Sequence, residues 1–183
     1  KKVVSPVLIR DRNTAIYYID FSFDNFQLGG SAFAQSLGKI GKTAPTVKDS
    51  EYFVSAFNTI QELIEKDLIL AGHDISAGGM ITALLEMNFG NPEGGLEINL
   101  DKIAEKDIIK ILFSENPGVL IQVKDKNSVE KILQNNGIGF SKIGRPCKER
   151  HILVKKDNAE YQFGIDYLRD VWFSSSYLLD RKQ

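Results

Sequence analysis

The sequence has little cysteine and no long apolar run. Cys147 is the single cysteine in 183 residues, which excludes an internal disulfide framework and a zinc site built from several cysteines. No apolar segment approaches the roughly 20 residues that a membrane-spanning helix needs. Because a lone cysteine suits a reducing compartment, we expect a cytoplasmic protein with no membrane partner.

The chain also lacks an excess of charge of either sign. Its 23 basic and 24 acidic residues give a formal net charge of −1. This balance supplies no non-specific attraction to nucleic acid, so we expect no nucleic-acid partner. Apolar residues make up 43% and charged residues 26% of the chain, which is the composition of an ordinary folded domain and argues against disorder.

The first residues lack both a secretory signal and an initiator methionine. Residues 1–6 read KKVVSP, without a long apolar stretch or a small-residue cleavage site. We therefore expect a mature fragment or an excised domain. Within it, residues 1–183 form a single domain, and residues 1–12 form a linker or lead-in strand.

Helix and strand patterns alternate along the whole chain. Aromatic and β-branched residues predict a strand at 14–21, and an apolar stripe predicts a helix at 50–66, capped by Asp49 or Ser50. The apolar run at 68–72 predicts a strand buried on both faces. Further helices are expected at 32–37, at 80–89, at 105–113, around Val129–Leu133 with Asn127 or Ser128 as its cap, and from Asp166 onward. Further strands are expected at 96–100, 119–123, 140–144, 151–155 and 160–164. This order predicts a mixed sheet covered by helices.

Two glycine-rich corners between a strand and a helix are the candidate binding features. In the first, Gly29 and Gly30 precede Ser31, which would begin a short helix. Glycines permit close approach of a ligand, and helix N-termini favour phosphate. The alternative is that Gly-Gly-Ser only forms a tight turn and a helix cap.

The second corner follows the buried strand predicted at 68–72. His73 and Asp74 lead into Ser76, Gly78 and Gly79. One carboxylate such as Asp74 suits Mg²⁺, which keeps phosphate oxygens and water as its other ligands. The alternatives are that Asp74 caps the following helix, that the glycines allow close helix packing, and that His73 is a core histidine.

Other signals for chemistry are weak. No Walker-type phosphate loop occurs, and the two histidines, His73 and His151, stand too far apart for a zinc motif. No nucleophile motif surrounds Cys147. Lys142, Arg145, Lys148 and Arg150 are expected to form a solvated loop. We therefore predict no catalytic residue in the chain.

The two corners together resemble one family of enzymes. Residues 28–35 (LGGSAFAQ), 71–80 (AGHDISAGGM), 118–123 (GVLIQV) and 168–172 (LRDVW) are similar to phosphoribosylformylglycinamidine synthase. The similarity is to the second AIR-synthase-related C-terminal domain of its large single-chain form. It implies an α/β fold, an α/β/α sandwich with ferredoxin-like elements. It also implies that residues 166–183 are a helix leading to a glutaminase domain.

The resemblance also implies an activity and its ligands. Members of this family are ATP-dependent ligases of purine biosynthesis. They transfer ammonia, derived from glutamine, to formylglycinamide ribonucleotide, and the reaction proceeds through an iminophosphate intermediate. The implied cofactors are ATP and Mg²⁺, and the implied partners are an ATP-binding AIR-synthase-type domain and the glutaminase domain. Since both domains are missing from these 183 residues, we expect the chain alone to be inactive.

Residue by residue, the resemblance places three kinds of contact on the two corners. Gly29, Gly30 and Ser31 match the turn that holds the substrate phosphate. Ser76, Gly78 and Gly79 match nucleotide contacts at an auxiliary site, Asp74 matches a Mg²⁺ ligand, and His73 matches a family position without a proton-transfer role. Ala77 departs from the pattern, since relatives often carry an acidic residue there, which removes a second carboxylate.

Two other readings stay open. In the first, the chain is the C-terminal domain of another AIR-synthase-superfamily enzyme, such as AIR synthase, selenophosphate synthetase or thiamine-phosphate kinase. Alternatively, it is a non-catalytic dimerisation or interaction module in which both glycine corners are purely structural.

Overall fold

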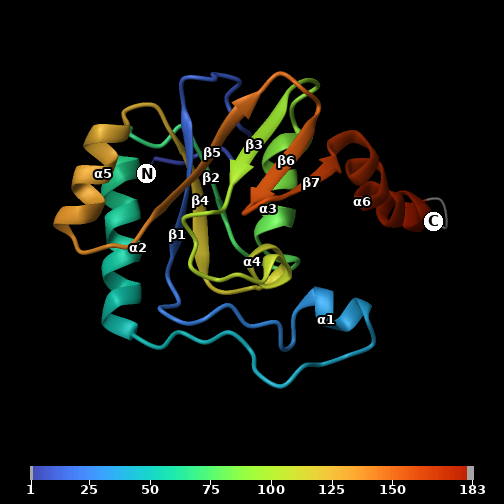
Figure 1. Ribbon diagram of the computed structural model, residues 1–183. Helices are drawn as coiled ribbons and strands as arrows, with labels where there is room; N and C mark the ends of the chain where they lie inside the picture. Colours follow the sequence, from blue (N-terminus) through green and yellow to red (C-terminus); the bar gives the residue numbers. More distant parts are fainter. Residues whose placement is uncertain (1, 181–183) are drawn as a thin grey trace.

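One mixed sheet runs through the molecule. The computed structural model describes the backbone of residues 2–180 and the side chains up to residue 174 (Figure 1). Seven strands follow the order β2-β4-β1-β5-β3-β6-β7, with β3 and β6 parallel and the other neighbours antiparallel. The strands are β1 (Ala15–Asp20), β2 (Ala71–Asp74), β3 (Gly95–Asn99), β4 (Gly118–Val123), β5 (Ser141–Cys147), β6 (His151–Lys156) and β7 (Ala159–Gly164).

Helices lie on both faces of this sheet. They are α1 (Ala32–Ser36), α2 (Ser50–Glu65), α3 (Gly79–Phe89), α4 (Ile108–Phe113), α5 (Lys126–Asn135) and α6 (Ile165–Asp180). In Figure 1, α2 and α5 stand beside β1 and β4, whereas α3 crosses the sheet on its other face. The expected α/β fold, a mixed sheet between helices, is confirmed.

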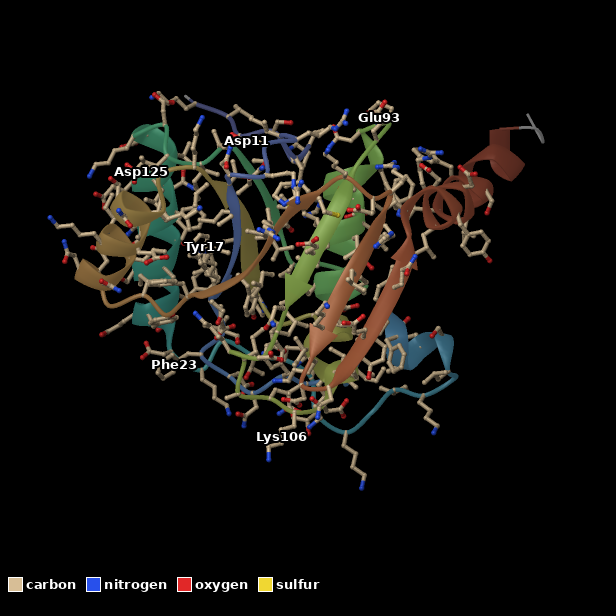
Figure 2. The ribbon with its side chains drawn as sticks, turned by 45° about the horizontal axis from the view of Figure 1, so that its top comes forward. Asp11, Tyr17, Phe23, Glu93, Lys106 and Asp125 are labelled. Atoms are coloured by element: carbon tan, nitrogen blue, oxygen red, sulfur yellow. The ribbon has the colours of Figure 1, made fainter. Side chains whose placement is uncertain are left out.

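The core under α2 and α5 is built on β1 and β4. Alternate residues of β1 point to this side because side chains in a strand alternate between faces. Tyr17 lies on β1, toward the side of the helices (Figure 2). It is fully buried, and its hydroxyl hydrogen-bonds to Glu130 of α5. Burial raises the pKa of the Tyr17 phenol, so the hydroxyl acts as a neutral donor. Ala56, Ile60 and Leu63 of α2 and Val129 and Leu133 of α5 complete this core.

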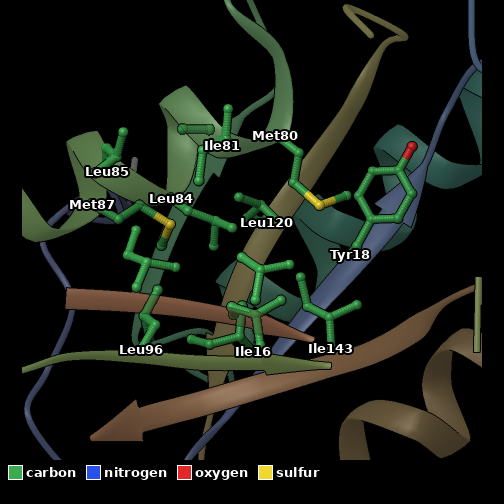
Figure 3. Packing of buried hydrophobic residues seen from close by; sticks show 14 of the residues in the cluster. Ile16, Tyr18, Met80, Ile81, Leu84, Leu85, Met87, Leu96, Leu120 and Ile143 are labelled. Carbon is green, nitrogen blue, oxygen red and sulfur yellow. The ribbon is translucent and has the colours of Figure 1, made fainter. Parts of the chain in front are cut away.

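The larger core lies between α3 and the opposite face of the sheet. Met80, Leu84 and Met87 on one side of α3 face Ile16, Leu96, Leu120 and Ile143 from four different strands (Figure 3). All seven are at most 1% exposed. A contiguous set of buried apolar side chains of this size supplies the main driving force for folding. It holds α3, whose N-terminus is the second glycine corner, against the sheet.

Several boundaries differ from the sequence-based expectations. The apolar run 68–70 is a connection packed on the core, and β2 begins only at Ala71, so His73 and Asp74 belong to the strand. β2 is also an edge strand and is not buried on both faces. Residues 2–12 contain no strand, so the prediction of a lead-in strand is wrong for these residues. The alternative prediction, that they form a linker, stays a prediction.

Helix caps also need correction. Asp49 caps α2 as predicted, with its carboxylate accepting from the amides of Glu51 and Tyr52. The cap of α5 is Asp125, not Asn127 or Ser128, and it accepts from the Ser128 amide. α6 already begins at Ile165, one residue before its predicted cap. The final residues 181–183 of the predicted last helix lie outside the described residues.

Along the described residues, 2–180, no helix combines the length and the hydropathy that crossing a membrane requires.

Candidate functional site

The first corner is a tight turn that Ser31 closes. Gly30 has a φ of +75°, a left-handed conformation that favours glycine. Ser31 is 1% exposed and caps α1, with its Oγ accepting from the Ala34 amide at 3.2 Å and donating to the Leu28 carbonyl at 2.7 Å. The capping alternative for Gly-Gly-Ser is therefore present in the structure.

A second segment packs directly on this corner. The amide of Gly29 donates to the Thr43 carbonyl at 2.8 Å, and the amide of Gly30 donates to the Ile40 carbonyl at 2.7 Å. A Cβ at position 29 would stand 2.3 Å from the Thr43 oxygen, so only glycine fits. Because these amides already have partners, a phosphate here would have to use the exposed surface of Gly30 or shift residues 40–43.

In the second corner, His73 and Asp74 are neighbours on β2, with 3.7 Å between His73 Nδ1 and Asp74 Oδ1. The His73 ring faces α3, where its Nε2 lies 3.2 Å from Glu86 Oε2, and its Nδ1 lies 2.7 Å from the Asp74 carbonyl oxygen. Asp74 extends its carboxylate into solvent with a side chain that is 74% exposed. His73 is therefore a half-buried structural contact, whereas Asp74 is available to a ligand.

The glycines of the second corner begin α3. Gly78 (φ +87°) is the N-cap of α3, without a side-chain cap, so the alternative that Asp74 caps this helix is wrong. A Cβ on Gly79 (φ +75°) would lie 2.7 Å from the Leu112 carbonyl oxygen, which explains why the turn needs glycine there. Ser76 is exposed, so its hydroxyl is accessible beside Asp74.

One carboxylate joins the two corners. Glu115 Oε1 accepts from the Ala32 amide of the first corner and from the Gly78 amide of the second, each at 2.8 Å. The structure thus brings together the two motifs that the sequence predicted as separate features. Sequence reasoning missed Glu115, because no local pattern around this residue indicates a contact with either corner.

The neighbours of Glu115 hold the first corner on the body of the domain. The Ser114 hydroxyl donates to the Gln27 carbonyl at 2.8 Å. The Asn116 side-chain amide donates to the Ser22 hydroxyl and to the Asn25 carbonyl, both at 3.0 Å. Ser114 and Asn116 are each 2% exposed, and unsatisfied polar groups at such positions are costly. They therefore fix the backbone on both sides of Glu115.

Two of the cavities that the described residues form open on the surface, and neither is lined by residues of both corners. The smaller, about 400 Å³, lies beside β2 and includes His73 and Asp74 among mostly apolar residues. The larger, about 980 Å³, lies over β3, β5 and β6. It is on the same face of the sheet as α2 and α5, but beyond the part that these two helices cover. Its cations are Arg12, Lys102, Lys126, Lys142, Arg145 and Lys155, and its carboxylates are Glu97 and Asp101.

Asp74 offers an exposed carboxylate to a metal ion at the second corner, whereas the Glu115 carboxylate there already accepts two amide hydrogen bonds. Among residues 2–180 no group of three or more histidine, cysteine or acidic side chains is close enough to hold a metal. Mg²⁺ with a nucleotide needs only one or two protein carboxylates. The exposed Asp74 side chain fits that requirement, with its other ligands drawn from phosphate oxygens, water or another domain.

Cys147 and Arg150 are held within the domain by burial and by hydrogen bonds, respectively. Cys147 is buried, and burial raises the pKa of its thiol, which disfavours the reactive thiolate. The expectation that the basic cluster forms a solvated loop is wrong for three of its residues. Lys142 and Arg145 lie on β5, and Arg150 binds two other parts of the domain. The Arg150 guanidinium donates to Asp166 of α6 at 3.0 Å and to the Gly94 carbonyl at 3.1 Å.

Comparisons with solved structures identify the fold. Thermotoga maritima PurL complexed with ATP matches 92% of this chain and 27% of its own, with a TM-score of 0.69 at 15% identity. T. maritima PurL complexed with FGAR matches 91% of this chain and 29% of its own, with a TM-score of 0.69 at 18% identity. The hydrogenase maturation protein HypE matches 88% of this chain and 56% of its own, with a TM-score of 0.55 at 13% identity. The fold is thus shared by proteins of more than one kind.

Sequence comparisons distinguish between these proteins more sharply than the comparison of folds does. The chain is 33% identical over its whole length to a probable phosphoribosylformylglycinamidine synthase of Arabidopsis thaliana, and 30% identical over 92% of its length to the human enzyme of that name. It spans only 13% of the length of each. The family described as AIR synthase related protein, C-terminal domain, matches residues 24–156, which is well over half of the chain. The chain therefore belongs to the AIR synthase related protein family, as a C-terminal domain of that family.

Proposed function

We propose that this chain is one domain of a phosphoribosylformylglycinamidine synthase. The support is its similarity to enzymes of that name from a plant, an animal and Dictyostelium discoideum, at 30–33% identity over at least 92% of the chain. Such an enzyme uses ATP and glutamine to convert formylglycinamide ribonucleotide to formylglycinamidine ribonucleotide. Because the chain spans such a small part of these relatives, the reaction belongs to the larger protein, and the isolated chain is inactive.

The domain's contribution is to bind phosphorylated ligands at its two corners. The substrate phosphate binds at the turn formed by Gly29, Gly30 and Ser31, through the exposed surface of Gly30 or after a shift of residues 40–43. Ser76, Gly78 and Gly79 contact a nucleotide. Asp74 supplies one carboxylate for the Mg²⁺ that accompanies it, and Mg²⁺ neutralises phosphate charge when bound. The observation that carries this proposal is the convergence of both corners on Glu115, with Asp74 and Ser76 left exposed beside them.

The domain works together with other parts of the same protein. An ATP-binding AIR-synthase-type domain and a glutaminase domain complete the enzyme, and α6 leads toward the glutaminase. The phosphorylated substrate and ATP are its small-molecule partners. We place the protein in the cytoplasm, as its single cysteine suggests, although the Arabidopsis relative is named as chloroplastic/mitochondrial.

An interaction module is the second candidate, and α6 favours it. Val171, Trp172 and Phe173 are each about half exposed, although Trp172 also contacts Phe89 at 6.0 Å between ring centroids. A helix with an exposed aromatic surface suits contact with another domain. This role is compatible with ligand binding at the corners. Another AIR-synthase-superfamily enzyme is less well supported, because HypE resembles the chain in fold alone.

Calorimetric titration of the 183-residue chain with Mg²⁺ and ADP tests the proposal. We expect the chain to bind Mg-ADP, and Asp74→Asn to weaken binding by about tenfold because one metal ligand is lost. Asp170→Asn is the matched control, since its side chain is also 74% exposed but lies on α6. No binding by the unmodified chain, or equal losses in both variants, would contradict the assignment. The isolated chain is also assayed with formylglycinamide ribonucleotide, ATP, Mg²⁺ and ammonia. Formation of product would contradict the proposal that the chain is a domain without activity of its own.

A further inference from the structure

We propose that Glu115 is a positioning residue that sets the distance between the two corners for a ligand contacting both. This inference rests on the proposed function, because it assumes that phosphorylated ligands bind at these corners. Glu115 would act through Ala32 and Gly78, whose backbones form the corners, and would not itself contact the ligand.

The geometry of the contact is the first argument. A single oxygen, Glu115 Oε1, lies 2.8 Å from the Ala32 nitrogen and 2.8 Å from the Gly78 nitrogen. The two amides are therefore held within two hydrogen-bond lengths of each other, although their residues are far apart in the sequence. Hydrogen bonds to a charged acceptor are also stronger than neutral ones, so this shared oxygen is an effective link between the corners.

The support of the Glu115 backbone is the second argument. Ser114 and Asn116 are nearly fully buried and bind the segment before the first corner through Gln27, Ser22 and Asn25. Glu115 therefore extends from a fixed backbone, and its side chain reaches both corners. A carboxylate in this place sets their separation, whereas Ser114 and Asn116 secure only the first corner.

The position of Glu115 outside both cores is the third argument. Its partly buried side chain belongs to the connection between α4 and β4, so we expect its removal to leave the packing of α2, α3 and α5 on the sheet intact. We therefore expect loss of the Glu115 side chain to release the corners from each other without unfolding the domain.

Hydrogen exchange in the 183-residue chain tests the contact without any ligand. In Glu115→Ala the amides of Ala32 and Gly78 should exchange about tenfold faster or more, as expected when a charge-assisted hydrogen bond is lost. Glu115→Gln keeps an acceptor oxygen and should show a smaller increase. Glu51→Ala, at an exposed position of α2, is the control and should leave both amides unchanged.

Titration of the same variants with inorganic phosphate tests the consequence for binding. Glu115→Ala should bind phosphate about tenfold more weakly, with partial rescue in Glu115→Gln. Unchanged exchange at both amides in Glu115→Ala would overturn the inference. Tighter phosphate binding in both variants would also overturn it, because Glu115 would then compete with the ligand. No binding by the unmodified chain would instead overturn the proposed function and the ligand part of this inference, while exchange still decides whether Glu115 holds the corners.

Discussion

The His73 ring of β2 lies against the Glu86 carboxylate of α3, with 3.2 Å between Nε2 and Oε2. Both side chains are partly buried, at 17% and 26% exposure. The contact joins the strand that carries Asp74 to the helix that begins at Gly79. The histidine of the second corner thus supports the site's architecture and leaves ligand contacts to its neighbours.

A double-mutant cycle on this pair measures that support. His73→Gln and Glu86→Gln should each destabilise the domain, and their coupling should be about 0.5–1.5 kcal/mol because one partly buried polar contact is shared. The free energy of unfolding in urea gives the values. Strictly additive effects would show that the two side chains do not support each other.

Alanine at Gly29 and at Gly30 should have different effects. Gly29→Ala places a methyl group 2.3 Å from the Thr43 carbonyl oxygen and should cost about 2 kcal/mol or more. Gly30→Ala meets no atom within 4 Å, so only its φ of +75° is unfavourable, at about 1 kcal/mol. Urea unfolding of both variants compares the costs. Equal costs would mean that residues 40–43 do not pack on the corner as described.

Acid should weaken the attachment of the segment before the first corner. A hydrogen bond from Lys48, with 2.5 Å between the charged atoms, is the main reason that the pKa of Asp24 is lowered from 3.8. Because the folded-state pKa is the lower one, the stabilisation is complete above pH 3.8 and is lost as the pH falls through the lowered value.

The variant Asp24→Asn isolates this effect from the other carboxylates with lowered pKa. The difference in unfolding free energy between the unmodified chain and Asp24→Asn should shrink as the pH falls from about 5 to about 2. Urea unfolding at several pH values measures it. A difference that stays constant over this range would show that Lys48 does not stabilise the charged form of Asp24.

Local patterns predicted the elements that carry strong periodicity. The apolar stripe of 50–66 and the Asp49 cap correspond to α2, and the aromatic strand at 14–21 corresponds to β1. The strand prediction was wrong for residues 68–70, because apolar side chains are found in buried connections as well as in strands. Ile69 packs in the core under α2, and pairing with β4 begins only at Ala71.

The candidate site was predictable only in part, for a physical reason. Glycine corners can be recognised locally, since positive φ and close approach demand glycine. Glu115 reaches partners 83 and 37 positions away, and no local pattern encodes such contacts. The same holds for the partners of the Gly29 and Gly30 amides, which only the folded chain brings against the corner.

Binding of a phosphorylated ligand across both corners is tested most directly by residue-resolved NMR. The isotope-labelled chain is titrated with formylglycinamide ribonucleotide, with and without Mg-ADP. We predict that the largest amide shifts fall on residues 30–32 and 76–79. Largest shifts around Lys142 and Lys155, in the cavity over the open sheet face, would contradict the assignment of the site to the two corners.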